Sequence, residues 1–288
     1  MRLLPAEPEE GHGLAVSYGA LPMTRDTVQT VEVLRFGEAR PTPDRVAVER
    51  PLEVRLNGHP FSIIMRTPGA DRDLALGFLF TEGVLRTRGD LERVDEDPDT
   101  GFVNVVFVRG RGEAVAEALD SRRPVAMNAS CGLCGRRTLD SLVLDAPRCA
   151  ADWSIPAETL AALPARLRAA QPAFAETGGL HAAGLFETDG RPVACAEDVG
   201  RHNAVDKLLG RMLAGDRLPL RQALLAVSGR ASFEIVQKAW RGGIPLVVAV
   251  SAPSSLAIDL AREAGITLLG FVRDGRFNVY THPERIAR

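Results

Sequence analysis

From Gly178 to the C-terminus, short apolar runs alternate with segments whose apolar residues recur at helical spacing. The runs ALLAVSG, PLVVAVS and TLLGFVR are continuously apolar, as strands buried on both faces are. Between them lie RHNAVDKLLGRMLAG, SFEIVQKAWRGG and SLAIDLAREAG, and Gly215 and Gly265 are suited to end the first and third of these helices. LHAAGLFE and PVACAEDVG flank an Asp-Gly turn and predict a hairpin. The alternation predicts βα units on a largely parallel sheet with helices on both faces.

The region before Gly178 has a different pattern. VAVERPLEVRLNGHPFSIIMRTP alternates apolar and polar residues around an Asn-Gly turn signal, which predicts a hairpin. ADRDLALGFLFTEGVL predicts a helix, GFVNVVFVR a strand, and PAETLAALPARLRAA a helix interrupted by Pro164. We therefore expect a smaller α+β domain over 26–125 and an α/β domain over 151–288. Residues 1–25 are expected to be a flexible tail, and 126–150 a loop and linker.

Composition excludes several classes of protein. Hydrophobic residues make up 45% of the 288 residues, enough for a substantial core. Lys plus Arg (35) nearly balance Asp plus Glu (37), so no overall charge recruits nucleic acid or an anionic membrane. No apolar run approaches the ~20 residues of a membrane span. The acidic N-terminus MRLLPAEPEEGHG does not fit a signal peptide. We expect a cytoplasmic protein with neither nucleic acid nor membrane as partner.

Cys131 and Cys134 form a C-x-x-C pair within NASCGLCGRR. In a reducing compartment such a pair binds a metal, cycles as a disulfide or carries sulfur. A structural zinc needs four ligands, usually from two such pairs, and only one pair is present, so no metal site is expected. Arg136 and Arg137 favour the reactive thiolate. An activated thiol with a second thiol nearby suits sulfur carriage, although the residues alone leave all three chemistries open.

Three predicted strands end in small, polar junctions that lead into helices: EDVGRHN, SGRAS and SAPSS. Free backbone N–H groups at helix starts are a natural seat for phosphate, although the serines can equally be simple N-caps. Arg201 and His202 fall in the first helical turn, where the helix dipole disfavours cations. An anionic ligand would compensate them, or Glu197 and Asp198 would do so through an internal salt bridge to Arg201. His181 begins the neighbouring strand.

Five motifs in a fixed order resemble one known family. They are SCGLCG, GGLHAAGLF, EDVGRHNAVDKLLG, SGRASFEIVQKAWRGGIPLVVAVSAPSSLA and GFVRDGRFNVYTH, and they are similar to the FdhD family of formate dehydrogenase accessory sulfurtransferases. The resemblance runs from about residue 28 to the C-terminus and includes ALGFLFTEG. It implies a cytidine deaminase-like three-layer α/β/α domain, without the zinc site of that fold, and a homodimer.

The resemblance also implies a function. The family takes persulfide sulfur from a cysteine desulfurase and passes it to the molybdenum (or tungsten) bis-guanine-dinucleotide cofactor before insertion into formate dehydrogenase. Cys131 matches its sulfur-carrying cysteine, Cys134 matches the second cysteine, and FVRDGR matches its cofactor-binding stretch. GDP is the expected mimic of the cofactor. The expected cofactor-binding residues are Phe271, Val272, Arg273, Asp274, Gly275 and Arg276, joined at the strand-end junctions by His181, Glu197, Asp198, Arg201, His202, Ser228 and Arg230.

Two other functions remain open at this point. One is a cofactor chaperone whose cysteines only contact the cofactor. The other is a dithiol redox protein, in which the C-x-x-C pair cycles between thiol and disulfide.

Overall fold

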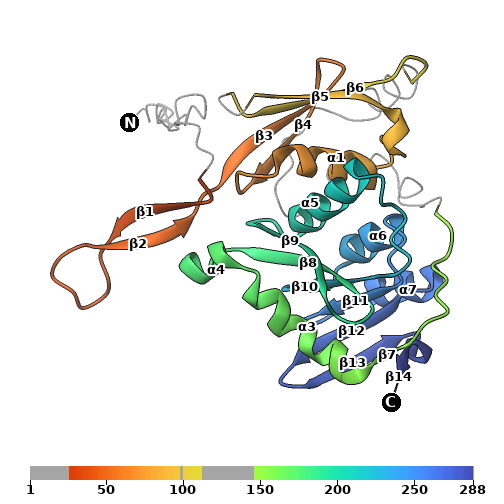
Figure 1. Cartoon of the computed structure of the whole chain (residues 1–288). Helices are drawn as coiled ribbons and strands as arrows, with labels where there is room; N and C mark the ends of the chain where they lie inside the picture. Colours follow the sequence, from red (N-terminus) through yellow and green to blue (C-terminus); the bar gives the residue numbers. More distant parts are fainter. Residues whose placement is uncertain (1–25, 98–99, 112–145, 288) are drawn as a thin grey trace, which may run out of the picture.

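The computed structural model of the chain describes residues 26–97, 100–111 and 146–287. The predicted tail at 1–25 and residues 126–145 of the predicted loop lie outside this part of the chain, and so do Cys131 and Cys134. The centre of the molecule is a six-stranded sheet in the order β13-β12-β11-β10-β8-β9 (Figure 1). Its strands are β8 (His181–Glu187), β9 (Pro192–Asp198), β10 (Ala223–Val227), β11 (Leu246–Ala249), β12 (Thr267–Arg273) and β13 (Arg276–Thr281).

This sheet is mixed rather than largely parallel as predicted. Strands β10, β11 and β12 are parallel, whereas β8 pairs antiparallel with both β9 and β10, and β13 pairs antiparallel with β12. The reason is local. Strands β8 and β9, and likewise β12 and β13, are joined by tight Asp-Gly turns, and a tight turn reverses the chain. These two hairpins, of which the sequence predicted the first, therefore supply both ends of the sheet.

Helices cover both faces of the sheet, as predicted. Helix α3 (Ala157–Ala169) packs on one face, while α5 (Arg201–Ala214), α6 (Phe233–Arg241) and α7 (Ser255–Ala264) cover the other (Figure 1). Side chains of β10 alternate between the two layers: Leu224 packs with α3, and Leu225 packs with the opposite helices. The three-layer α/β/α architecture is confirmed, and its likeness to cytidine deaminase stays a prediction.

Helix α3 runs through Pro164 without a break, so the predicted interruption is wrong. An interior proline removes one backbone hydrogen bond and costs about 3 kcal/mol. Leu160, Leu163 and Leu167 are each buried on the face that packs against the sheet. Burying a leucine contributes about 1.5–3 kcal/mol, so three buried leucines outweigh the proline.

Among its described residues, the first region contains a four-stranded sheet in the order β4-β3-β6-β5 and the α-helix α1. Asn57 and Gly58 have φ of 50° and 87°, the left-handed pair that a two-residue hairpin turn needs, so the predicted hairpin is confirmed. The elements are β3 (Arg50–Leu56), β4 (His59–Arg66), α1 (Asp71–Thr81), β5 (Leu91–Asp97) and β6 (Phe102–Phe107).

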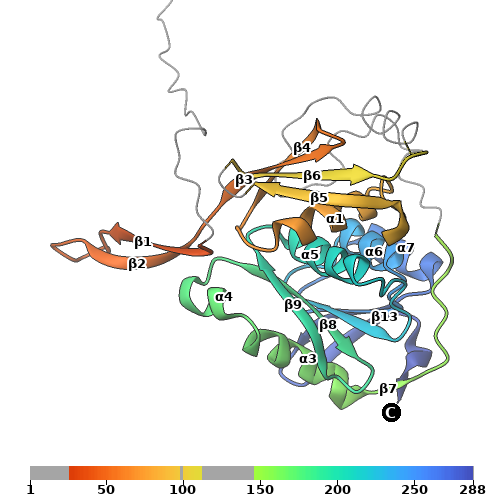
Figure 2. The same cartoon turned by 45° about the horizontal axis from the view of Figure 1, so that its top comes forward.

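Helix α1 lies between this sheet and α5 (Figures 1 and 2). Buried side chains of α1, β3 and β6 belong to the same hydrophobic cluster as those of α5, α6 and the central sheet. One continuous core thus joins the two regions. The predicted domain boundaries stay a prediction.

A two-stranded ribbon of β1 (Val28–Val33) and β2 (Thr42–Ala47) projects from this body (Figures 1 and 2). An Arg45–Glu176 ion pair of 2.8 Å links it to the short helix α4 (Pro172–Thr177). Near the C-terminus, β7 (Ile155–Pro156) pairs with β14 (Ile286–Ala287).

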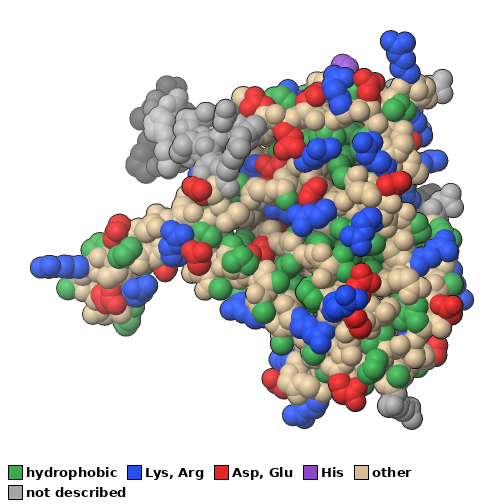
Figure 3. All heavy atoms as spheres, in the orientation of Figure 1, with side chains coloured by type: hydrophobic (Ala, Val, Ile, Leu, Met, Phe, Trp, Pro, Cys, Tyr) green, Lys and Arg blue, Asp and Glu red, His purple; other side chains and the backbone are tan. Residues whose placement is uncertain are grey.

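Basic and acidic side chains are interspersed over the face shown in Figure 3. Within the described ranges, no helix has the length and apolar character to cross a membrane.

Candidate functional site

The predicted strand-end junctions meet at one edge of the central sheet. Strand β9 continues through Gly200 into α5, β10 continues through Ser232 into α6, and β11 continues through Ser254 into α7. His181 at the start of β8 is paired in the sheet with Asp198 at the end of β9, so it lies at the same edge. The carboxyl ends of parallel strands, with helix starts behind them, form the usual ligand site of open α/β sheets.

Positively charged side chains gather at this edge. Burial lowers the pKa of His181, and the nearby positive charges of Arg201, His202 and Arg230 lower it further. Gly229 lies between two of these groups: a Cβ atom there would be 3.4 Å from His181 Nδ1 and 3.8 Å from Arg201 Cδ. Arg201 Nε is buried and has no hydrogen-bond partner among the residues described. A cluster of cations with an unpaired guanidinium nitrogen is suited to hold an anion.

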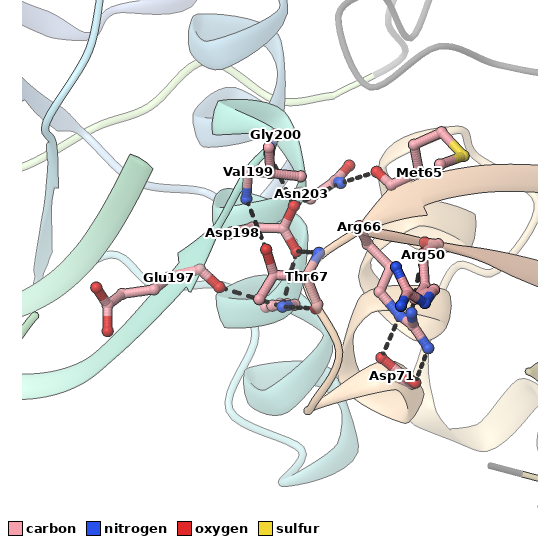
Figure 4. A network of polar contacts seen from close by, with 11 residues as sticks. Arg50, Met65, Arg66, Thr67, Asp71, Glu197, Asp198, Val199, Gly200 and Asn203 are labelled. Atoms are coloured by element: carbon pink, nitrogen blue, oxygen red, sulfur yellow. Dashed lines mark hydrogen bonds and ion pairs between the residues drawn. The ribbon is translucent and has the colours of Figure 1, made fainter. Parts of the chain in front are cut away.

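Asp198 is fully buried, and its carboxylate lies among Thr67, Gly200 and Asn203 (Figure 4). Its carboxylate lies 2.7 Å from Lys207 Nζ and accepts hydrogen bonds from the backbone N–H groups of Thr67 (3.2 Å) and Gly200 (2.8 Å) and from Asn203 Nδ2 (2.8 Å). Thr67 belongs to the segment between β4 and α1, and its hydroxyl accepts a hydrogen bond from Val199 N. The Asp198 network therefore fixes the turn that precedes Arg201.

The Glu197 side chain points to the opposite side from Asp198 (Figure 4). Its carboxylate accepts hydrogen bonds from the backbone N–H groups of Ala173 (3.1 Å) and Phe174 (2.7 Å), at the start of α4. Glu197 therefore ties α4 to β9. The predicted alternative, an internal salt bridge from Glu197 or Asp198 to Arg201, is not what the described residues form.

His202 is buried between α5 and α6. Its Nε2 lies 2.6 Å from a carboxylate oxygen of Glu234 and 3.2 Å from the hydroxyl of Ser232. Glu234 is thus the negative partner for a histidine at the start of a helix, where the helix dipole disfavours positive charge. The sequence analysis missed Glu234, because only folding brings the starts of α5 and α6 together.

A pocket of about 590 Å³ opens beside the cation cluster. His181 and Ser228 line it together with Leu167, Gln171 and Phe174 from α3, α4 and the junction between them. Its volume falls within the range of small-molecule sites. The sequence analysis missed Gln171 and Phe174, since no motif marks this junction.

The FVRDGR stretch is the β12–β13 hairpin, turned by Asp274 and Gly275 with φ of 52° and 72°. Phe271 is 38% exposed, also has a positive φ (55°), and donates its backbone N–H to Ser251 O, which ties the hairpin to the end of β11. A positive φ is strained for a residue other than glycine, and such strain gathers at functional sites. A depression of about 700 Å³ is lined by Phe271, Arg273, Asp274, Gly275, Arg276, Phe277 and Asn278.

Val272 differs from the rest of this stretch. Its side chain is fully buried in the core layer under α3. Val272 therefore anchors the hairpin, while the arginines on either side of the turn, Arg273 and Arg276, are open to a ligand. Within the ranges described, no group of three His, Cys, Asp or Glu residues has a spacing that would hold a metal ion.

Fold and site together define an α/β/α protein with a cationic sheet edge suited to an anionic ligand. Residues 47–287 match the model of the FdhD/NarQ family. The chain is 49% identical over 267 residues to the sulfur carrier protein FdhD of Streptomyces avermitilis, covering 88% of this chain and 93% of the relative. It is 50% identical over 266 residues to the sulfur carrier protein FdhD of Anaeromyxobacter dehalogenans, covering 88% and 92%.

A crystal structure described as a formate dehydrogenase accessory protein from Desulfotalea psychrophila has the same fold. Its TM-score is 0.71 at 28% identity, over 90% of this chain and 98% of that chain. The chain belongs to the FdhD/NarQ family. The family resemblance predicted from its motifs is confirmed.

Proposed function

We propose that this protein carries sulfur from a cysteine desulfurase to the molybdenum (or tungsten) bis-guanine-dinucleotide cofactor of formate dehydrogenase. Membership of a family whose relatives are named sulfur carriers supports the sulfur chemistry. The observation that carries the cofactor assignment is the cation cluster of Arg201 and Arg230, which lies beside His181 at the sheet edge. A dinucleotide cofactor bears diphosphates, and guanidinium groups bind phosphate through paired, charge-assisted hydrogen bonds.

The two cysteines carry out both sulfur steps, and a thiol reductant then regenerates them. The Cys131 thiolate attacks the outer sulfur of the desulfurase persulfide, takes that sulfur and releases the desulfurase thiolate. The Cys134 thiolate then attacks the sulfur atom of Cys131. This forms a disulfide and expels hydrosulfide, which becomes a ligand of the cofactor metal. The cysteine pair supplies the two electrons that reduce the carried sulfur atom to hydrosulfide. A thiol reductant must afterwards reduce the disulfide.

Mass spectrometry tests the first step. After incubation with desulfurase and cysteine, the peptide that contains Cys131 should gain the mass of one sulfur atom, and Cys131→Ala should abolish the gain. The matched control is Cys149→Ser combined with Cys195→Ser. Burial raises the pKa of both of these thiols to about 11, so they stay protonated near pH 7 and should not be needed for loading.

The same experiment separates the alternatives. A protein that binds GDP but gains no sulfur is a cofactor chaperone. A stable Cys131–Cys134 disulfide that thioredoxin reduces, without any sulfur adduct, indicates a redox protein. Light scattering on the purified chain tests the homodimer that the family implies. Formate dehydrogenase activity in a deletion strain complemented with this gene tests whether that enzyme is the physiological acceptor.

A further inference from the structure

The β1–β2 ribbon ends in exposed apolar side chains. Phe36 at its tip is fully exposed to solvent and Leu34 is 66% exposed, which makes them the two most exposed large apolar residues of the described chain. The ribbon stands clear of the body in both cartoon views and in the space-filling view (Figures 1, 2 and 3). Exposed apolar groups gathered at the end of a projecting element are typical of a surface that binds another protein.

One side of the ribbon continues this apolar surface. The strand register places Val31, Val33 and Val46 on one side and Arg45 on the other. Arg45 pairs with Glu176 of α4, so the valine side is turned away from that helix. The three valines are only partly buried, and they belong to neither of the hydrophobic clusters formed by the described residues. The tip and the valine side together form one apolar strip.

The ribbon also has unpaired backbone. It is a sheet of two strands, and in the described part of the chain neither outer edge pairs with a further strand. A two-stranded hairpin alone in water is marginally stable, and unpaired strand edges invite pairing with another chain. A transient partner would leave the ribbon uncovered between encounters. A second copy of the chain is present wherever the protein is, so it is the partner that can cover the ribbon permanently.

The charge of the ribbon also suits a second copy. The charged residues of 28–47 are Glu32, Glu38 and Asp44, and Arg35, Arg40 and Arg45. Three basic residues minus three acidic residues give a net charge of zero, so one ribbon does not repel another.

The area available is of the right size. Each partner in a standard protein interface buries roughly 800 Å². A buried aromatic side chain contributes about 150–250 Å², so Phe36 alone supplies roughly a fifth to a third of that area. Leu34 and the valine side add to it.

We propose that the β1–β2 ribbon is the arm through which two copies of this chain associate, with Leu34, Phe36 and the valine side packed against the second copy. A two-fold arrangement uses the same patch on both copies, so both ribbons are covered at once. The family resemblance implies a homodimer without naming a surface for it, and the ribbon supplies that surface. The inference does not depend on the proposed sulfur chemistry.

Light scattering and sedimentation over a dilution series test the proposal on the full chain. Leu34→Ser combined with Phe36→Ser, the tip variant, should raise the dissociation constant of the dimer about a hundredfold or more, because buried aromatic anchors dominate interface affinity. The matched control is Ile63→Ser combined with Leu256→Ser, which removes two apolar side chains of 43% and 53% exposure from β4 and α7. The control should dimerise as tightly as the wild type.

Hydrogen exchange locates the interface on the chain. Peptides from residues 28–47 should exchange more slowly at protein concentrations above the dissociation constant than below it. In the tip variant this difference should disappear over the same concentrations. A wild-type dimer in which exchange in 28–47 is independent of concentration overturns the inference, because the two copies then meet through another face.

A wild type that stays monomeric at every concentration also overturns the inference, as does a tip variant that dimerises as tightly as the wild type. If a monomeric wild type binds the cysteine desulfurase and the tip variant does not, the tip belongs to that enzyme and the inference is equally wrong. Failure of sulfur loading at Cys131 bears on the proposed function alone. Neither tip residue belongs to a core cluster, so circular dichroism should show a folded tip variant, and Phe36→Ser alone repeats the test if it does not.

Discussion

The backbone of Gly77 in α1 lies against the backbone of Asp206 in α5, so closely that a Cβ atom on Gly77 would sit 1.8 Å from the Asp206 carbonyl oxygen. The contact is reciprocal: a Cβ atom on Gly210 in α5 would lie 1.8 Å from the carbonyl oxygen of Asp73 in α1. Glycine costs about 1 kcal/mol relative to alanine inside a helix. Here it is needed, because only glycine lets the two helices touch through their backbones.

Gly77→Ala should therefore destabilise the fold by about 3 kcal/mol or more, since the obstructing atoms are backbone and cannot turn aside. Urea denaturation measures the loss. Gly89→Ala is the control: a Cβ atom there makes only an ordinary 3.6 Å contact with the Thr87 hydroxyl, and stability should change by less than about 0.5 kcal/mol. Equal stabilities for the two variants would show that α1 and α5 sit farther apart.

Two buried Lys–Asp pairs allow stability to be separated from ligand binding. Lys207 pairs with Asp198, and Lys238 pairs with Asp206, each at 2.7 Å. Lys207→Met and Lys238→Met each leave a buried carboxylate unpaired and should cost about 3–5 kcal/mol. Only Lys207→Met should also weaken GDP binding, because Asp198 holds the turn before Arg201. Calorimetry well below the melting temperatures of both variants measures their GDP affinities. Equal affinities for the two variants would show that Asp198 has only a structural role.

His181 should make stability depend on pH. Burial, then Arg201, lower its folded pKa below the ordinary 6.5. As pH falls below about 6.5, the unfolded chain takes up a proton there while the folded protein stays neutral, so the free energy of unfolding decreases until pH passes the folded pKa. Above about pH 6.5, His181 is neutral in both states and does not change the free energy of unfolding. Melting temperatures from pH 7.5 to 5 should fall less steeply for His181→Gln than for the wild type. A bound anion raises the pKa of His181, so GDP affinity should increase over the same acid range.

Arg201→Gln and Arg276→Ala should each weaken GDP binding about tenfold or more, because a charge-assisted contact to phosphate contributes roughly 1.5–3 kcal/mol. The affinity of the wild type should also fall with added salt more steeply than that of either variant. Arg93→Ala is the control, because its side chain is 57% exposed on β5 in the other sheet. Unchanged affinity in a folded Arg276→Ala variant would remove the hairpin arginine from the site.

Local patterns in the sequence predicted most elements of this fold. The Asn57–Gly58 turn and the helix ends at Gly215 and Gly265 lie where the turn and helix-end signals place them. These signals act over a few residues, so a single chain reveals them. The sheet is less parallel than predicted, because hairpins add antiparallel strands to both ends of the parallel set. The continuity of α3 through Pro164 was missed, because burial of its leucines depends on the assembled sheet.

The site was predictable only in outline. The junctions after β9, β10 and β11 were placed at one edge by the general rule for α/β sheets. The partners of the charged residues at these junctions could not be predicted. Asp198 accepts a hydrogen bond from the backbone of Thr67, and this contact joins segments far apart in sequence. Gln171 and Phe174 had no signal, because no motif marks the junction that places them beside the pocket.

The single core that joins α1 to α5 limits where the chain can be cut into separately expressed fragments. Val205, Leu208 and Leu209 of α5 are fully buried in a cluster that also contains Leu74, Leu76 and Leu79 of α1. A fragment starting at residue 146 would expose part of this apolar helix surface to water, where it would favour aggregation over a soluble fold. Both halves of the chain are therefore needed for the turn before Arg201 to form.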